Sequence, residues 1–284
     1  MVISKEIKMS GTLFVVGTPI GNLGDISPRA LKTLEECDFI AAEDTRVTLK
    51  LLNHFEIKKP LISYFEHNRR QKGEYITDRI LSGESCAIVT DAGMPAVSDP
   101  GEDLVALCHE RGIPVSVVPG PSAFVAAIAL SGLPVGRFTF EGFLSVSKVS
   151  RREHLREVQK EKRTMVFYEA PHKLSATLCD MYSYFGDRKI AIVREITKIH
   201  EEVIRTTLKE AAEKYKEESL KGEIVLVIEG YTEDEADEPT LEDAILKAKE
   251  YMNEGMSVSF AAKMAAKDTG IKKGDIYKAL QEDE

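Results

Sequence analysis

The stretch TLFVVGTPIGNLGDISPRALKTLEECDFIAAEDTRVTLKLLNHFEIKKPLISYF, residues 12–65, decides the fold. Runs rich in β-branched and aromatic residues begin at positions 12, 38 and 60, and each has the length of a strand. Amphipathic patterns of helical length, at 28–36 and 45–55, separate these runs. Alternation of this kind predicts βαβ units and a parallel sheet.

The alternation continues to residue 130, and its strands are almost continuously apolar. Because such strands suit a sheet that is covered on both faces, we expect helices on both sides of it. The segment SGLPVGR (131–137) then ends the first domain, since its glycines and proline oppose regular structure. The further elements expected before it are a helix near 72–81, a strand at 86–90, a helix near 101–111, a strand at 113–118 and a helix near 122–130.

Strands are more frequent in the second half of the chain and favour a mixed sheet there; they are expected at 138–144, 164–169, 189–195, 202–207 and 223–230. After an acidic run at 231–240, three short helical patterns follow, and the last two resemble a helix-turn-helix. The sequence therefore predicts an α/β protein with two α/β domains and a small C-terminal helical appendage. The predicted bounds are 11–131 for the N-terminal domain, 136–230 for the C-terminal domain and 240–284 for the appendage.

Composition and charge argue against several classes of protein. The formal net charge of −9 over 284 residues disfavours a protein that only coats nucleic acid, because such binding depends on neutralised phosphates. No apolar stretch approaches the roughly 20 residues that cross a bilayer. The N-terminus also lacks the apolar core of a secretory signal, so we expect a cytoplasmic protein without a membrane partner. The four cysteines are widely spaced, without a C-x-x-C pair, so we expect neither a metal site nor a disulfide framework.

One segment is locally basic. Between positions 148 and 163 there are seven Lys or Arg residues against three Glu, a local charge of +4. One interpretation is a stripe that faces RNA phosphates, together with Arg46, Arg69 and Arg70. The other is an ordinary solvated helix with Glu–Arg and Glu–Lys pairs.

Three loops rich in glycine and proline follow predicted strands. In VGTPIGNLGD (16–25), three glycines would let the backbone approach a ligand, but their spacing fits neither the dinucleotide fingerprint nor a Walker A loop. An alternative interpretation combines this loop with Glu43 and Asp44 as a nicotinamide-dinucleotide site.

The other two loops offer polar groups near the same sheet edge. VTDAGMPAVSDPG (89–101) is longer than a plain strand-to-helix connection. Its Asp91 and Asp99 are candidates to bind ribose hydroxyls or an amino group, or to cap the next helix. VPGPSA (118–123) puts Ser122 at a helix N-terminus, where unpaired N–H groups would bind a carboxylate or adenine.

Two strand ends of the second half carry acids and bases and are expected to form one face of a cleft. FYEAPHK (167–173) supplies Glu169 and Lys173, and REITKIHEE (194–202) supplies Glu195 and Lys198. Surface charge is the alternative for each of these residues.

Together, these segments resemble the tetrapyrrole-methylase family. The resemblance rests on VGTPIGNLGDISPRAL, AAEDTR, SYFEHN, VTDAGMPAVSDPG, VPGPSA, FYEAPHK, REITKIHEE and KGEIVLVIEG, which occur in order between about residues 11 and 230. It implies two α/β domains, a homodimer, and S-adenosyl-L-methionine bound in a cleft between the domains. The cofactor contacts that it implies are Pro19, Ile20, Asp91, Ala92, Gly93, Met94, Pro95, Ser122, Ala123, Tyr168 and Ala170.

The resemblance also implies a substrate. Porphyrin-methylating relatives have a Gly-Asp-Pro loop where this sequence has Thr90-Asp91-Ala92, which argues against a tetrapyrrole. Glu43 to Arg46, Tyr64 and His67-Asn68 instead match members that act on ribosomal RNA. The implied reaction is 2′-O-methylation of a cytidine ribose in small-subunit ribosomal RNA, either free or in the assembled subunit. The alternatives are methylation of a tetrapyrrole-like small molecule and noncatalytic RNA binding through the C-terminal helices.

The expected chemistry needs no metal, because a sulfonium carries its own positive charge and leaving group. A ribose hydroxyl is a poor acid, so a base should help, typically by 10² to 10⁴. Glu169 and Glu195 are the candidate bases, and Lys173 and Lys198 are candidates to stabilise the developing oxyanion.

Overall fold

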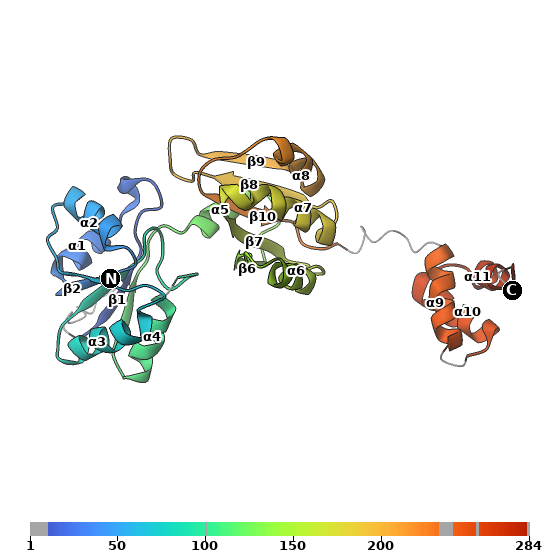
Figure 1. The fold of residues 1–284 in the computed structure, drawn as a ribbon, viewed down its shortest axis with the longest axis horizontal. Coiled ribbons are helices and arrows are strands. Elements are labelled where there is room, and N and C mark those ends of the chain that lie inside the picture. Colours follow the sequence, from blue (N-terminus) through green and yellow to red (C-terminus); the bar gives the residue numbers. More distant parts are fainter. Residues whose placement is uncertain (1–10, 100, 233–240, 254–255, 283–284) are drawn as a thin grey trace, which may run out of the picture. The chain divides into compact units, whose positions relative to one another are not determined.

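The computed structural model describes residues 11–99, 101–232, 241–253 and 256–282. The chain divides into two compact units, residues 1–230 and 231–284 (Figure 1). The predicted domain bounds at 131 and 136 fall inside the first unit, which holds two separate five-stranded sheets.

The first sheet is wholly parallel, as the βαβ alternation predicts, with the order β3-β2-β4-β1-β5. Helices connect its strands and lie on both of its faces (Figure 1). Its elements are β1 (Leu13–Val16), α1 (Pro28–Glu36), β2 (Phe39–Ala42), α2 (Thr45–His54), β3 (Leu61–Ser63), α3 (Arg69–Leu81), β4 (Cys86–Val89), α4 (Gly101–Glu110) and β5 (Val115–Val118).

Strand β1 shows why these strands are apolar throughout. Phe14 and Val16 pack in a cluster with residues of α1 and α2. Leu13 and Val15 point to the opposite face and pack with residues of α3 and α4. Successive side chains of a strand point to opposite faces of the sheet. Because helices cover both faces here, both sets of side chains are buried and apolar.

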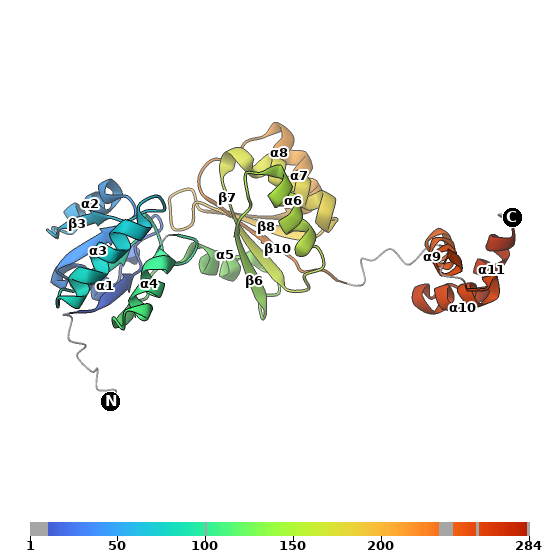
Figure 2. The same ribbon diagram turned by 60° about the horizontal axis from the view of Figure 1, so that its bottom comes forward.

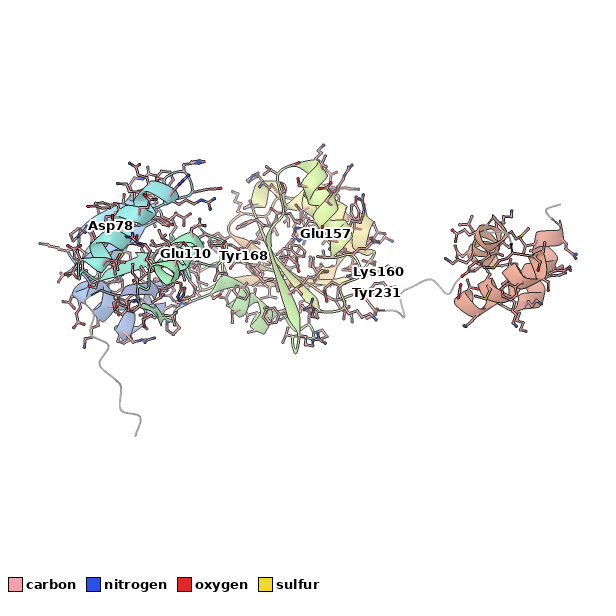
Figure 3. The ribbon with its side chains drawn as sticks, turned by 90° about the horizontal axis from the view of Figure 1, so that it is seen from below. Asp78, Glu110, Glu157, Lys160, Tyr168 and Tyr231 are labelled. Atoms are coloured by element: carbon pink, nitrogen blue, oxygen red, sulfur yellow. The ribbon has the colours of Figure 1, made fainter. Side chains whose placement is uncertain are left out.

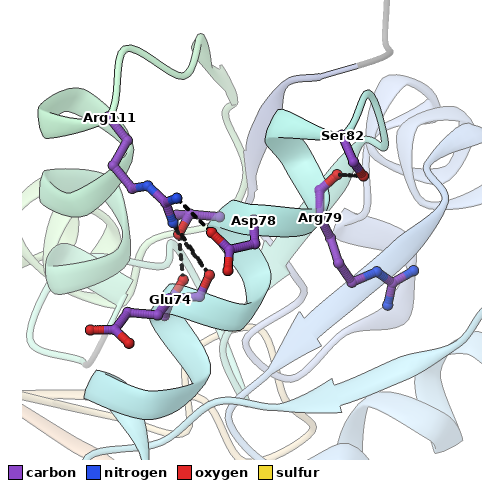
Figure 4. A network of polar contacts seen from close by, with 7 residues as sticks. Glu74, Asp78, Arg79, Ser82 and Arg111 are labelled. Carbon is purple, nitrogen blue, oxygen red and sulfur yellow. Dashed lines mark hydrogen bonds and ion pairs between the residues drawn. The ribbon is translucent and has the colours of Figure 1, made fainter.

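Polar contacts also join α3 to the end of α4. The Arg111 guanidinium lies 2.5 Å from the Asp78 carboxylate and donates to the backbone oxygen of Glu74 (Figure 4). Ser82 donates to the backbone oxygen of Arg79 where α3 ends. The contacts of Arg111 therefore join α3 to the end of α4 on one face of the first sheet.

The second sheet is mixed, as its sequence predicts, with the order β6-β7-β10-β8-β9. β6 pairs parallel to β7, and the remaining pairs are antiparallel. One face packs against α6, α7 and α8 (Figure 2). Its elements are β6 (Phe138–Phe143), α6 (Lys148–Glu157), β7 (Thr164–Glu169), α7 (Leu174–Phe185), β8 (Lys189–Arg194), β9 (Glu202–Thr207), α8 (Leu208–Glu217) and β10 (Ile224–Ile228).

Helix α5 (Ala123–Ser131) covers the other face of the second sheet, although the predicted bounds assign it to the N-terminal domain. Its Ala127 and Ile128 are buried among residues such as Val166 and Val193. At its end the Arg205 guanidinium donates to the backbone oxygen of Ser131. The chain therefore begins to pack against the second sheet before it reaches the Gly/Pro-rich segment 131–137.

The second unit consists of α9 (Leu241–Asn253), α10 (Val258–Thr269) and α11 (Lys273–Glu282), which confirms the three helices of the appendage. Its small core is built mainly from alanines, among them Ala244, Ala261 and Ala265. Most of the predicted acidic linker and the first ten residues lie outside the described residues. Within the described ranges, no helix has the length and apolarity that a membrane crossing requires.

Candidate functional site

The topology of the first sheet brings two of the predicted loops together. β1 and β4 are neighbours, but the chain leaves β1 toward β2 and leaves β4 toward β5, on opposite sides. Ligands of open α/β sheets bind where connections diverge in this way, beyond the carboxyl ends of the strands. The two loops pair here, since Thr18 and Gly93 exchange backbone hydrogen bonds of 2.9 and 3.1 Å.

Two glycines of the first loop, Gly17 and Gly21, lie in close contact with other segments of the protein. A Cβ on Gly17 would lie 2.6 Å from the Met94 sulfur and 2.7 Å from Cα of Gly120. A Cβ on Gly21 would lie 2.5 Å from Cγ of Lys198, in the second half of the chain. Both glycines are therefore required by the close approach of other segments.

A cavity of about 420 Å³ lies beyond these strand ends and is lined by residues from both sheets. Nine of the eleven predicted cofactor contacts line it. They are Ile20, Asp91, Ala92, Gly93, Met94, Ser122, Ala123, Tyr168 and Ala170.

The two remaining predicted contacts lie elsewhere. Pro19 lines a smaller neighbouring cavity of about 280 Å³, which also includes Thr48 and Leu51 of α2. Thr90 and Asp91 line both cavities. Pro95 is buried and lines neither of them.

The wall of the larger cavity is acidic. Its lining contains five carboxylates and, among the described residues, no Lys, Arg or His. Burial raises the pKa of Asp91, and the negative charge of Glu43 raises it further. The five carboxylates belong to Glu43, Asp91, Asp99, Glu169 and Glu223. Such a wall favours a cationic ligand over an anionic one.

Two of these carboxylates are held by the loops around them. The Thr90 hydroxyl donates to the Glu43 carboxylate. Asp99 accepts from the backbone N–H groups of Ala96, at 2.9 Å, and Gly101, at 2.8 Å. Burial raises the pKa of Asp99, while these backbone hydrogen bonds act in the opposite direction. Asp99 thus fixes the conformation of its loop and of the start of α4, which agrees with the interpretation that it caps this helix.

The N-terminus of α5 also reaches the cavity. Ser122 occupies the N-cap position, but its side chain makes no capping hydrogen bond, so simple capping does not account for it. Tyr168, labelled in Figure 3, comes from β7 and lines the cavity. Burial raises the pKa of this phenol, while the backbone of Phe124 acts in the opposite direction.

The structure separates the four predicted catalytic residues. Glu169, the last residue of β7, lines the cavity with only 5% of its surface exposed. It accepts a hydrogen bond of 2.7 Å from the backbone N–H of Ala170. Lys173 is half-buried on the turn that follows and does not line the cavity.

Glu195 and Lys198 form a second cluster, next to the cavity but outside its lining. The Lys198 ammonium lies 2.9 Å from the Glu195 carboxylate and 3.3 Å from the carboxylate of Glu223, which lines the cavity. Glu195 also accepts from the backbone N–H of Glu223 at 3.0 Å. Two hydrogen bonds lower the pKa of Glu195: the larger effect comes from Lys198 and the smaller from the backbone of Glu223.

Several lining positions are absent from the sequence-based set, among them Glu223, Phe143 and Ser98. Glu223 stands immediately before β10, and its only signal was its place at the start of an apolar strand. Phe143 and Ser98 also line the cavity. Nothing in their local patterns distinguishes them from ordinary strand and loop residues.

The basic segment is only partly available to a ligand. Arg151 is 11% exposed and pairs with Asp180 of α7 at 2.5 Å, and Arg163 pairs with Glu161 at 2.7 Å. Arg46 and Arg69 pair with Asp44 and Asp103, respectively. Lys148, Arg152 and Arg156 remain exposed and form no ion pair with any residue that the structure describes.

Comparison with known proteins agrees with this architecture. Residues 12–212 match the tetrapyrrole (corrin/porphyrin) methylases. The chain is 46% identical over 270 residues to the ribosomal RNA small subunit methyltransferase I of Halalkalibacterium halodurans, covering 94% of this chain and 93% of that protein. The protein of the same name from Thermotoga maritima is 49% identical over 220 residues, which cover 78% of this chain and 99% of the relative.

Solved structures share the fold at much lower identity. Diphthine synthase aligns with a TM-score of 0.59 at 16% identity, over 78% of this chain and 90% of the other. The uroporphyrin-III C-methyltransferase of Thermus thermophilus aligns with a TM-score of 0.56 at 18% identity, over 77% and 94% of the two chains. These similarities support the fold of two α/β domains, each with its own sheet.

Proposed function

The chain belongs to the tetrapyrrole (corrin/porphyrin) methylase family, and on that premise we propose that it methylates the ribose 2′-hydroxyl of a cytidine in small-subunit ribosomal RNA. The methyl donor is S-adenosyl-L-methionine. The relatives named as small-subunit ribosomal RNA methyltransferases support this choice of substrate, because they share 39–49% identity over most of the chain. The solved methyltransferases that share the fold are less than 25% identical and say nothing of the acceptor.

The acidic cavity fits this cofactor. S-adenosyl-L-methionine supplies, when bound, a methyl group on a positively charged sulfur that is a good leaving group. Asp91 and Glu43 would attract its positive charges, and Ser122 and Ala123 offer the N-terminus of α5 to its carboxylate. Ile20 and Tyr168 offer apolar surface to an adenine. The dinucleotide interpretation of the first loop loses its support, since the chain belongs to a methylase family.

Glu169 is the group that we assign as general base. It is the predicted base that lines the cavity, and Lys198 does not neutralise it. Its carboxylate would accept the proton of the ribose hydroxyl as the oxygen becomes nucleophilic. Lys173, on the turn after Glu169, would favour the developing negative charge.

Glu195 and Lys198 hold the cavity wall in our proposal. Their ion pair fixes Glu223 at the edge of the lining. We further propose that the protein acts as a homodimer in the cytoplasm on free ribosomal RNA or the assembled small subunit. A tetrapyrrole-like acceptor is the second candidate, because the family includes corrin and porphyrin methylases.

The observation that carries the proposal is the acidic cavity, which nine of the expected cofactor contacts line. The test incubates the full chain with radiolabelled S-adenosyl-L-methionine and small ribosomal subunits that lack ribose methylation. Nuclease digestion and mass spectrometry then locate the label, which we expect on one cytidine ribose. Calorimetric binding of the cofactor without label on the RNA would contradict the proposed substrate.

A further inference from the structure

A β-bulge brings two rings of one strand to the same side of the second sheet. In a regular strand, residues 140 and 143 would point to opposite faces. The pairing of β6 with β7 shifts between Phe140 and Gly142, and Gly142 has a φ of +65°. As a result both Phe140 and Phe143 lie against Tyr168, with ring centroids 5.1 and 5.2 Å apart from it. Bulges often re-aim side chains in this way beside active sites.

The two phenylalanines differ in exposure. Phe140 is half-buried and stacks on Phe124, whereas Phe143 lines the cavity and is 58% exposed. The Tyr168 ring contacts Phe143 and also contacts Phe140, which stacks on Phe124. Phe143 is therefore a supported aromatic ring with one free side at the edge of the cavity.

The charges around Phe143 suit a nucleic acid strand. Helix α6 begins five residues after it and carries the exposed and unpaired Lys148, Arg152 and Arg156 among the described residues. The cavity lining beside the ring is acidic and would repel phosphates. Binding sites for single-stranded nucleic acids combine an aromatic platform with cationic groups that follow the backbone. Val146, 75% exposed, extends the apolar surface between the ring and α6.

We propose that Phe143 is a stacking platform for a nucleobase of the unpaired RNA strand at the cavity mouth, with α6 contacting the adjacent phosphates. This inference rests on the proposed function and names the residues that would hold its RNA. The acceptor ribose would be positioned because its strand is held on the ring, while Glu169 and the cofactor contacts act inside the cavity.

Steady-state kinetics of Phe143→Ala test the platform. We expect KM for small ribosomal subunits to rise about 5- to 150-fold, the range that base–aromatic stacking implies. The calorimetric Kd for S-adenosyl-L-methionine should stay unchanged, and Phe143→Tyr should restore KM, whereas Phe143→Leu should not. An unchanged KM in Phe143→Ala would overturn the inference and leave the proposed function intact. Absence of methyl transfer by the wild type would instead remove the proposed function itself.

A fluorescence experiment tests stacking without turnover. The chain has no tryptophan, so Phe143→Trp introduces a single reporter. We expect a short single-stranded oligocytidylate to quench its emission. Phe138→Trp, on the same strand but outside the cavity lining, is the matched control and should not respond. Quenching of Phe143→Trp by S-adenosylhomocysteine alone, with no further change on adding RNA, would assign the ring to the cofactor and overturn the inference.

Discussion

Glu169 and Glu195 stand at the same edge of one sheet, yet their carboxylates have different surroundings. β7 and β8 flank β10, and Ile224 of β10 is paired with both Glu169 and Arg194, the residue before Glu195. Glu169 is buried at the cavity and accepts a hydrogen bond from the backbone next to it. Glu195 is held by Lys198 and by the backbone of Glu223, outside the lining.

Among the described residues, Glu169, the base that we propose, forms no ion pair, whereas Glu195 is held by Lys198. Glu195 has a φ of +51° and Thr197 a φ of +65°, both in the left-handed region that costs energy for residues other than glycine. Such strain persists where surrounding contacts fix it, and the contacts of Glu195 with Lys198 and Glu223 have that effect. The lowered pKa also makes the Glu195 carboxylate a weaker base than an ordinary glutamate.

The largest effect is expected for Glu169→Gln. Removal of the base should lower single-turnover methyl transfer by about 10² to 10⁴, since that is the usual contribution of general-base catalysis. Calorimetry should show near-normal cofactor binding, because the amide keeps the shape of the side chain. A rate within about threefold of the wild type would contradict the assignment.

Glu195→Gln should have a smaller effect. Lys198 keeps its second partner, Glu223, so the segment stays near its place and the rate should fall no more than about tenfold, less than for loss of a base. The same single-turnover assay measures both variants. If Glu195→Gln were the slower of the two, the roles that we assign to these carboxylates would be reversed.

Gly222→Ala should displace the Glu195 side chain. A Cβ at this position would clash with the Glu195 carboxylate, and the φ of +94° is strained for alanine. We expect urea denaturation to show a loss of about 1–3 kcal/mol in the free energy of unfolding. Gly112→Ala is the matched control, since Gly112 has a φ of +68° but no atom within 4 Å of the added Cβ. Equal losses in both variants would show that backbone strain alone, without the Glu195 contact, explains the effect.

The smallest effect concerns pH. Because the pKa of folded Glu195 lies below its ordinary value of 4.5, its ion pair stabilises the fold above that pH, and the stabilisation disappears as pH falls through the lowered pKa. The stability advantage of the wild type over Glu195→Gln should therefore shrink in acid. Denaturation midpoints of both proteins across this pH range measure it. An advantage that is independent of pH would rule out the carboxylate charge as its source.

Periodicity predicted the first sheet well, because its strands are covered on both faces and carry no polar alternation. It could not assign α5 to one of the two sheets, because the helix is apolar on all sides and so shows no preferred face. Periodicity could not predict the ion pair of Arg151 with Asp180 either, because these two residues are 29 positions apart in the chain. The role of Glu223 depends on the insertion of β10 between β7 and β8, which local patterns do not reveal.

Nine of the eleven residues that the family resemblance implies as cofactor contacts line the cavity, whereas dividing the catalytic candidates into two groups needed three-dimensional information. Glu169 and Glu195 look alike in sequence, each ending a strand with a lysine three or four positions later. Only the structure shows that Lys198 turns back onto Glu195, while no ion pair with Glu169 is found among the described residues.

We propose that the ribose hydroxyl of one cytidine accepts the methyl group with Glu169 as its base. The most direct test of this proposal uses small subunits reconstituted with RNA in which that single cytidine carries 2′-deoxyribose. We expect these subunits to bind the protein but to take up no label from S-adenosyl-L-methionine. Label transferred to the base of the 2′-deoxycytidine, at a rate close to that of the unmodified subunit, would contradict it.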